Sequence, residues 1–174
     1  MSRPLILVSN DDGITSKGIL TLVSAMKKLG DVIVVAPDSP QSGMGHAITV
    51  GETLRLEENF IFEGVRAFEC SGTPADCVKM ARHFVLRDQR QPDVIVSGVN
   101  HGSNSSISVL YSGTMSAAIE GAIEGTPSIG FSLCDYSHKA DMSHLEPILI
   151  KITDMVLKKG LPNGVALNVN IPPK

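Results

Sequence analysis

The sequence predicts a doubly wound α/β sandwich, in which helices cover both faces of a mostly parallel sheet. Short runs rich in Val, Ile and Leu recur along the chain, as in "LILVS", "DVIVVAP" and "DVIVSGV", and segments with helical patterning separate them. Continuous apolar strands of this kind are typical of a parallel sheet that is buried on both faces. The alternation of strands and helices therefore indicates a three-layer α/β/α arrangement.

The predicted elements follow one another as strand and helix, and some helices carry recognisable start signals. Thr73 can cap a helix, Pro74 suits its first position, and Asp76 places a carboxylate in its first turn. Ser143 followed by Glu146 has the spacing of a capping box. We therefore expect strands at residues 5–9, 31–37, 93–99, 128–133 and 165–171, and helices at residues 18–30, 76–86, 112–125 and 145–160.

Glycines are expected to stop two of these helices, at Gly30 and Gly160. In the last helix one apolar face is traced by Leu145, Ile148, Leu149, Ile152 and Val156. The segment 47–70 departs from the pattern, because its apolar residues alternate near period 2 and turn residues intervene. We expect a β-hairpin excursion around residues 47–70, carried on the same domain.

Size and composition limit the class of protein. With 174 residues and 43% hydrophobic content, residues 1–174 are expected to form a single domain with a sizeable core. No apolar run approaches the roughly 18 residues of a membrane span, and the first apolar stretch is short for a secretory signal. We therefore predict a cytoplasmic protein with no membrane partner. A net charge of −3 and an aromatic content of 4% argue against polymeric nucleic acid and favour a small ligand.

Two adjacent aspartates, Asp11 and Asp12, follow the first predicted strand. At about 4 Å and an effective dielectric near 20, their repulsion is on the order of 4 kcal/mol, so a proton, a basic side chain or a metal ion must offset it. Adjacent residues on a strand point to opposite faces, so the two carboxylates converge only if the chain bends. Gly13 permits that bend.

Three further segments at strand exits and a helix start are rich in glycine and short oxygen-bearing side chains: "APDSPQSGMGH", "SGVNHGSNSS" and "YSGTMSAA". Ligands bind at the carboxyl ends of the strands in open parallel sheets, so we expect these loops to form one site. Two carboxylates with a serine hydroxyl and an asparagine carbonyl form an all-oxygen set, which suits Mg²⁺, Mn²⁺ or Ca²⁺. The helix that starts near Ser112 would add unpaired amides for an anionic substrate.

Several side chains have simpler interpretations. An Asp-Asp-Gly sequence alone is usually a turn, and Lys17 is expected to be solvated rather than paired with the aspartates. The five histidines have no ligand spacing, so we interpret them as surface or satisfied core residues. Met80 and Phe84 fall on one helical face and are expected to belong to the core.

Five segments in a fixed order resemble the SurE survival-protein family of metal-dependent 5'/3'-nucleotidases: "ILVSNDDGITSKGI", "VVAPDSPQSGMGHAIT", "SGTPADCVKMA", "PDVIVSGVNHGSN" and "YSGTMSAAIEG". The similarity runs from residue 5 to about residue 171. It implies a Rossmann-like α/β fold, a cytoplasmic location and release of phosphate from nucleoside monophosphates, with activity on short polyphosphate in some members.

The resemblance also implies roles for individual residues. The family's ligands for Mg²⁺ or Mn²⁺ fall on Asp11, Asp12, Ser42 and Asn100. Its phosphate loop and helix start match Asn104, Ser112, Gly113 and Thr114. We expect Asp11 to orient or deprotonate the attacking water while it also ligates the metal.

Other classes of protein share parts of this pattern. A haloacid-dehalogenase-type phosphatase needs a nucleophilic Asp two residues before a second Asp, and Asn10 occupies that position. A phosphoacceptor receiver-type domain also has an acidic pair after its first strand, but needs an Asp where this chain has Asn100. A non-catalytic nucleotide-binding module is a further alternative, because fold alone does not establish function.

Members of the resembled family continue past the strand at residues 165–171 into an extension that helps to build the oligomer, whereas this sequence stops at Lys174. We therefore predict that the 174 residues lack the usual carboxyl-terminal extension and are the retained part of a longer polypeptide. We expect the complete protein to be a homodimer or homotetramer that acts on nucleoside monophosphates.

Overall fold

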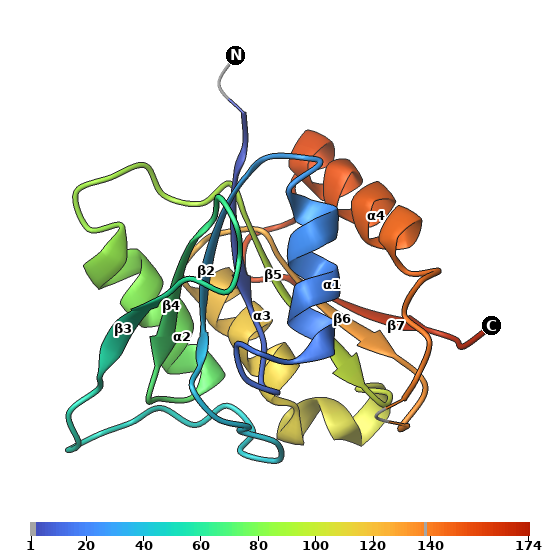
Figure 1. Cartoon of the computed structure of the whole chain (residues 1–174), viewed down its shortest axis with the longest axis horizontal. Helices are drawn as coiled ribbons and strands as arrows, with labels where there is room; N and C mark the ends of the chain where they lie inside the picture. The colour runs from blue at the N-terminus through green and yellow to red at the C-terminus, as the bar shows by residue number, and fades with distance from the viewer. Residues whose placement is uncertain (1–2, 138) are drawn as a thin grey trace.

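The computed structural model describes residues 3–137 and 139–174, and its centre is a seven-stranded sheet (Figure 1). The strands are β1 (Leu5–Ser9), β2 (Asp31–Pro37), β3 (Leu56–Asn59), β4 (Arg66–Cys70), β5 (Val94–His101), β6 (Ser128–Leu133) and β7 (Ala166–Ile171). The α-helices are α1 (Lys17–Met26), α2 (Pro74–Met80), α3 (Gly113–Ile123) and α4 (Glu146–Lys159). A π-helical turn (Ala81–Val85) follows α2, and a 3₁₀ helix (Ser106–Tyr111) precedes α3.

The strands lie in the order β3-β4-β2-β1-β5-β6-β7, and every neighbouring pair is parallel except β3 with β4. This arrangement confirms the predicted mostly parallel sheet. The expected hairpin is present as the antiparallel pair β3–β4, but β4 also pairs in parallel with β2. The hairpin is therefore part of the main sheet, and residues 47–55 form the loop that leads into it.

Side chains of the central strand β1 alternate between two cores. Ile6 and Val8 belong to a core that includes Leu22 of α1 and Leu149 of α4. Leu7 belongs to the opposite core, with residues of α2 and α3. Burial of both faces explains why the strand sequences are continuously apolar, and Figure 1 shows the two pairs of helices on either side of the sheet.

The start signal predicted for α2 is confirmed. The Asp76 amide donates to the Thr73 hydroxyl (3.2 Å), and the Thr73 amide donates to the Asp76 carboxylate (2.9 Å), with Pro74 opening the helix. Two backbone amides at this helix start, which would otherwise be unpaired, are thus each hydrogen-bonded to the side chain of the other residue.

The capping box predicted for α4 is wrong. Leu145 occupies the capping position and makes no side-chain cap. The Ser143 hydroxyl donates to Asp141 (2.9 Å), and Glu146 pairs with Lys28 of the α1 end (2.5 Å), so both side chains have competing partners. Local spacing identified a helix start here but could not identify these partners.

The two glycines expected to stop helices behave differently. Gly160 ends α4 with a φ of 68°, as predicted. The first helix, in contrast, already ends at Met26, before Gly30. Gly30 packs so close to the Pro4 carbonyl that an added Cβ would collide with it, so its small size serves a chain contact rather than a helix cap.

The expectation that Phe84 is a core residue is wrong, because its side chain is 69% exposed. The turn from Ala81 to Val85 is π-helical, which is wider than an α-helical turn and rotates the residues that follow Met80. Met80 keeps its expected place against the core.

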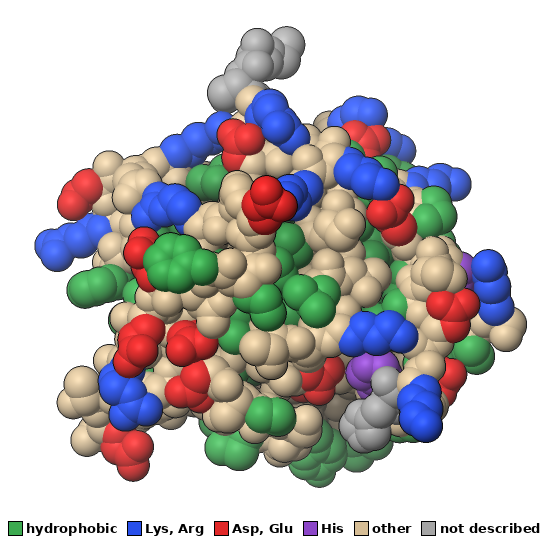
Figure 2. All heavy atoms as spheres, viewed as in Figure 1, with side chains coloured by type: hydrophobic (Ala, Val, Ile, Leu, Met, Phe, Trp, Pro, Cys, Tyr) green, Lys and Arg blue, Asp and Glu red, His purple; other side chains and the backbone are tan. Residues whose placement is uncertain are grey.

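Among the described residues, no helix is both long and apolar enough to cross a membrane. On the face shown in Figure 2, acidic and basic side chains are interspersed rather than gathered into a continuous basic patch.

Candidate active site

Loops that follow β1, β2 and β5 meet the start of α3 around one cavity of about 290 Å³. The strand order places β1 between β2 and β5, so the carboxyl ends of these strands are neighbours. The cavity is lined by six of the predicted site residues, namely Asp11, Asp12, Ser42, Asn100, Asn104 and Ser112. It is also lined by Gly43, His101, Ser103, Ser108, Tyr111 and Tyr136.

Asp11 is the most buried carboxylate of this cavity, with 5% of the residue exposed. The Thr114 hydroxyl donates to its Oδ1 at 2.6 Å. Burial is the largest cause that raises the pKa of Asp11, and the neighbouring Asp12 carboxylate also raises it, while hydrogen bonds from Thr114 lower it; the net pKa is about 6, against the usual 3.8. The folded protein therefore holds a negative charge at a position where that charge is unfavourable without a compensating partner.

The raised pKa of Asp11 predicts a pH-dependent stability in metal-free protein. Between pH 4 and pH 6 the unfolded chain releases this proton before the folded chain does, so stability falls as pH rises. The difference of about two pKa units corresponds to roughly 3 kcal/mol at neutral pH. We expect Asp11→Asn to raise the free energy of unfolding in excess chelator by up to that amount at pH 7.5, with the gain vanishing near pH 4.

Denaturant unfolding at both pH values would measure this effect, with Asp88→Asn at an exposed carboxylate as the control. A gain that is the same at both pH values, or a loss at pH 7.5, would contradict it.

The other predicted metal ligands also have oxygen atoms near the acidic pair. The side-chain amide of Asn100 donates to the Gly102 carbonyl (3.0 Å), which leaves its Oδ1 available to a cation. The pairing register of β5 with β6 shifts between Ser97 and Asn100, and Asn100 then pairs with Ser132 close to the end of β5. Ser42 lies on the exposed loop after β2, and the Gln41 amide next to it donates to the Asp11 carbonyl (2.7 Å).

The start of α3 faces Asp11 directly. A Cβ added to Gly113 would lie 2.5 Å from the Asp11 Cβ, and Thr114 is fully buried with its hydroxyl and backbone both hydrogen-bonded to Asp11. The Thr114 hydroxyl is thus committed to Asp11, and contact of Thr114 with substrate stays a prediction. Ser112 does line the cavity, and its Oγ accepts from the Met115 amide (3.0 Å), which leaves its O–H free to donate.

Asn104 is 6% exposed and anchored on three sides. Its side-chain amide donates to the Ser132 hydroxyl (2.9 Å), its backbone amide donates to Asn170 (2.8 Å), and its carbonyl accepts from Asn168 (2.8 Å). The structure thus gives Asn104 a role in holding the loop. Sequence reasoning missed Asn168 and Asn170, whose positions on β7 gave no sign of a contact more than 60 residues away.

Sequence reasoning also missed the two tyrosines of the chain and one histidine. Tyr111, Tyr136 and His101 all line the cavity, although none belongs to a spaced motif. Of the other histidines, His46 pairs with Glu120 and His83 with Glu124, which agrees with their interpretation as satisfied residues. Lys17 is exposed, as expected of a solvated lysine, and its amine donates to the Ala140 carbonyl (2.6 Å).

The donor set of the cavity suits a hard divalent cation. Within residues 3–137 and 139–174 no group of three or more His, Cys, Asp and Glu side chains is placed to hold a metal ion. The cavity offers two carboxylates with a hydroxyl and an amide oxygen, which is the oxygen-only chemistry of Mg²⁺ and Mn²⁺.

The fold and this cavity define an α/β protein with an acidic, oxygen-lined ligand site at the carboxyl edge of a parallel sheet. A family model described as "Survival protein SurE" matches residues 6–174. The chain therefore belongs to the SurE family, as its five ordered segments predicted.

Known proteins resemble the chain over almost all of its length. The "5'-nucleotidase SurE" of Cytophaga hutchinsonii is 66% identical over 172 residues, which cover 99% of this chain and 66% of the relative. The protein of the same name from Bacteroides fragilis is 50% identical over 170 residues, which cover 98% of this chain and 66% of the relative. The crystal structure of the SurE protein from Aquifex aeolicus matches with a TM-score of 0.88 and 40% identity over 98% of this chain and 67% of that one. The chain thus spans about two thirds of the length of these relatives.

Proposed function

We propose that the complete protein is a divalent-metal-dependent phosphomonoesterase that hydrolyses nucleoside 5'- and 3'-monophosphates to nucleoside and phosphate. The observation that carries the proposal is the buried carboxylate of Asp11 beside Asp12, in one cavity with oxygen atoms of Ser42 and Asn100. The name 5'-nucleotidase on relatives up to 66% identical supports the same activity.

In this proposal Asp11, Asp12, Ser42 and Asn100 hold Mg²⁺ or Mn²⁺. The chemistry that such an ion supplies is neutralisation of charge on the phosphoryl group and acidification of a water molecule. The protein's own contribution is to fix the orientation of the carboxylates. The Thr114 hydroxyl does this for Asp11, because it donates to Oδ1 at 2.6 Å. Asp11 is then placed to orient the attacking water or to take its proton.

Other cavity residues would bind the substrate. The O–H of Ser112 can donate to a phosphoryl oxygen, while Asn104 holds the opposite loop in place. Tyr111 and Tyr136 are 61% and 75% exposed, and they give the cavity aromatic surface on which a nucleobase can stack. These rings favour a nucleoside monophosphate over a phosphate ester that lacks a base.

A panel of phosphate esters tests the proposal. We expect 5'-AMP and 3'-AMP to be hydrolysed about tenfold more efficiently than ribose 5-phosphate, because only the nucleotides can stack a base. Excess chelator should abolish hydrolysis, and Mn²⁺ or Mg²⁺ should restore it. Full activity in chelator would refute the metal site, whereas nucleotide binding without turnover under every condition would identify a non-catalytic binding module.

A further inference from the structure

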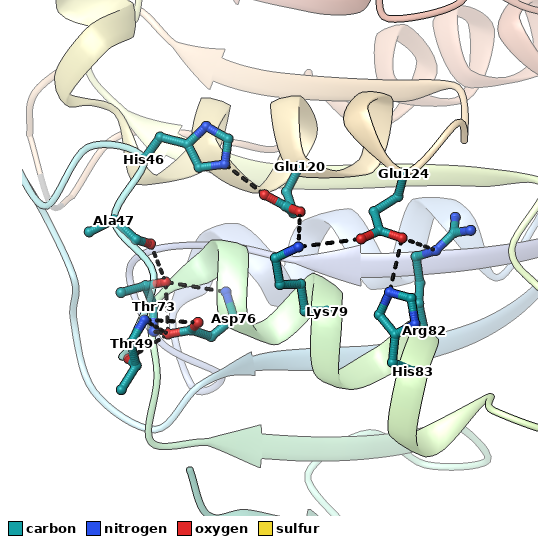
Figure 3. A network of polar contacts seen from close by, with 10 residues as sticks. All are labelled: His46, Ala47, Thr49, Thr73, Asp76, Lys79, Arg82, His83, Glu120 and Glu124. Carbon is teal, nitrogen blue, oxygen red and sulfur yellow. Dashed lines mark hydrogen bonds and ion pairs between the residues drawn. The ribbon is translucent and has the colours of Figure 1, made fainter. Parts of the chain in front are cut away.

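The loop between β2 and β3 carries Ser42 to the cavity. It then crosses to helices α2 and α3, where His46, Ala47 and Thr49 make polar contacts (Figure 3). Ser42 lies between two backbone contacts. The Gln41 amide donates to the Asp11 carbonyl (2.7 Å), and the Gly45 amide donates to the Tyr111 carbonyl (3.3 Å). Residues 41–45 form a short arch, in which the Met44 amide donates to the Gln41 carbonyl (3.4 Å) and Gly43 and Gly45 have φ values of 78° and 60°, which glycine adopts readily.

The first side-chain anchor after Ser42 is His46. Its Nε2–H donates to Oε2 of Glu120 on α3 at 2.8 Å. The Glu120 side chain is 4% exposed, and its other oxygen pairs with Lys79 of α2 at 2.6 Å. A buried carboxylate is costly without partners, so Glu120 is held firmly and offers His46 a fixed point of attachment.

Contacts farther along the loop secure its continuation. The Thr73 hydroxyl donates to the Ala47 carbonyl (2.7 Å), and the Thr49 hydroxyl donates to Asp76 (2.6 Å). These contacts follow His46 along the chain, whereas Ser42 precedes it. His46 is therefore the side chain best placed to set where the arch of residues 41–45 ends.

We infer that His46 is a positioning residue, which uses its hydrogen bond to Glu120 to fix the arch that presents the Ser42 hydroxyl to the acidic pair. This inference rests on the proposed function, because it assumes that Ser42 helps to hold the metal. His46 acts through Ser42 and has no contact of its own with the ion.

The same network contains a matched control. His83 pairs with Glu124, also on α3, at 2.9 Å, but His83 lies on the π-helical turn and not on the loop that carries Ser42 (Figure 3). Removing His83 deletes a histidine–glutamate pair of nearly the same length and leaves the arch intact.

Mn²⁺ affinity, measured by titration of metal-free protein, tests the inference. We expect His46→Ala to weaken binding about tenfold, as is typical when an outer partner of a ligand is lost. His46→Gln, which keeps an N–H donor, should restore most of the affinity, and His83→Ala should match wild type. When Ser42→Ala is already present, His46→Ala should cause little further loss of Mn²⁺ affinity, because both changes act through the same metal ligand.

Limited proteolysis of metal-free protein gives a second measurement. His46→Ala should speed cleavage within residues 38–55. It should leave the melting temperature unchanged, whereas a loss of core packing would lower it. Unchanged Mn²⁺ affinity in His46→Ala would overturn the inference alone. Additive effects of His46→Ala and Ser42→Ala would also overturn it. Absence of Mn²⁺ binding by the wild type would overturn both the inference and the proposed metal site.

Discussion

Gly113→Ala is expected to reduce nucleotide hydrolysis by about a hundredfold or more, which is the loss typical of a 1 Å displacement at a reacting centre. The new methyl group would lie 2.5 Å from the Asp11 Cβ, which is closer than real Cβ atoms approach, and 3.0 Å from its Oδ2. Because Asp11 is buried and held by Thr114, it cannot move away without leaving its place in the cavity. Steady-state hydrolysis of 5'-AMP at saturating Mn²⁺ would measure the loss.

Gly164→Ala is a suitable control for this experiment. An added Cβ at Gly164 meets open space, but the residue has a φ of 73°, so the substitution strains the backbone far from the cavity. It should lower the free energy of unfolding and leave hydrolysis unchanged. Wild-type turnover in Gly113→Ala would show that the start of α3 does not fix Asp11.

Asp12→Asn is the second change with a large expected effect. We propose Asp12 as a direct ligand of the metal, and loss of a direct ligand should cost at least as much as the 10–100-fold typical when a residue that only hydrogen-bonds a ligand is lost. We therefore expect Mn²⁺ affinity and turnover to fall by about a hundredfold or more. The protein should still fold, because the Asp12 charge raises the pKa of buried Asp11 and its removal relieves that repulsion.

Mn²⁺ titration and thermal unfolding in excess chelator would separate these two effects of Asp12→Asn. The variant should unfold at or above the wild-type temperature without metal, and below it when the wild type is saturated with Mn²⁺. An unfolding temperature clearly below wild type in chelator would mean that Asp12 has a structural role that outweighs the repulsion.

The sequence predicted the fold and much of the cavity for one physical reason. In a parallel sheet the residues that leave neighbouring strands meet at one edge, so Asp11, Ser42 and Asn100 could be grouped without knowledge of distances. The strands were equally clear, because burial on both faces makes their sequences apolar throughout.

The partners of these residues could not be predicted in the same way. Thr114 reaches Asp11, and Glu120 reaches His46, across large separations in the chain, and no local spacing encodes either contact. Phe84 was misplaced because a π-helical turn changes the period on which the prediction depended. Ser143 was misassigned because Asp141 competes for its hydroxyl.

The anchoring of the loop around Asn104 by Asn168 and Asn170 has a consequence for the order in which the parts of the protein fold during synthesis. The cavity is begun by residues near the amino terminus, yet one of its walls is held by the strand made last among those described. During synthesis, contacts of such long range form late, after the local elements have already assembled. A nascent chain can therefore pair β1 to β6 before β7 has docked, whereas its ligand site is finished only once β7 is in place, so ligand binding reports the docking of β7.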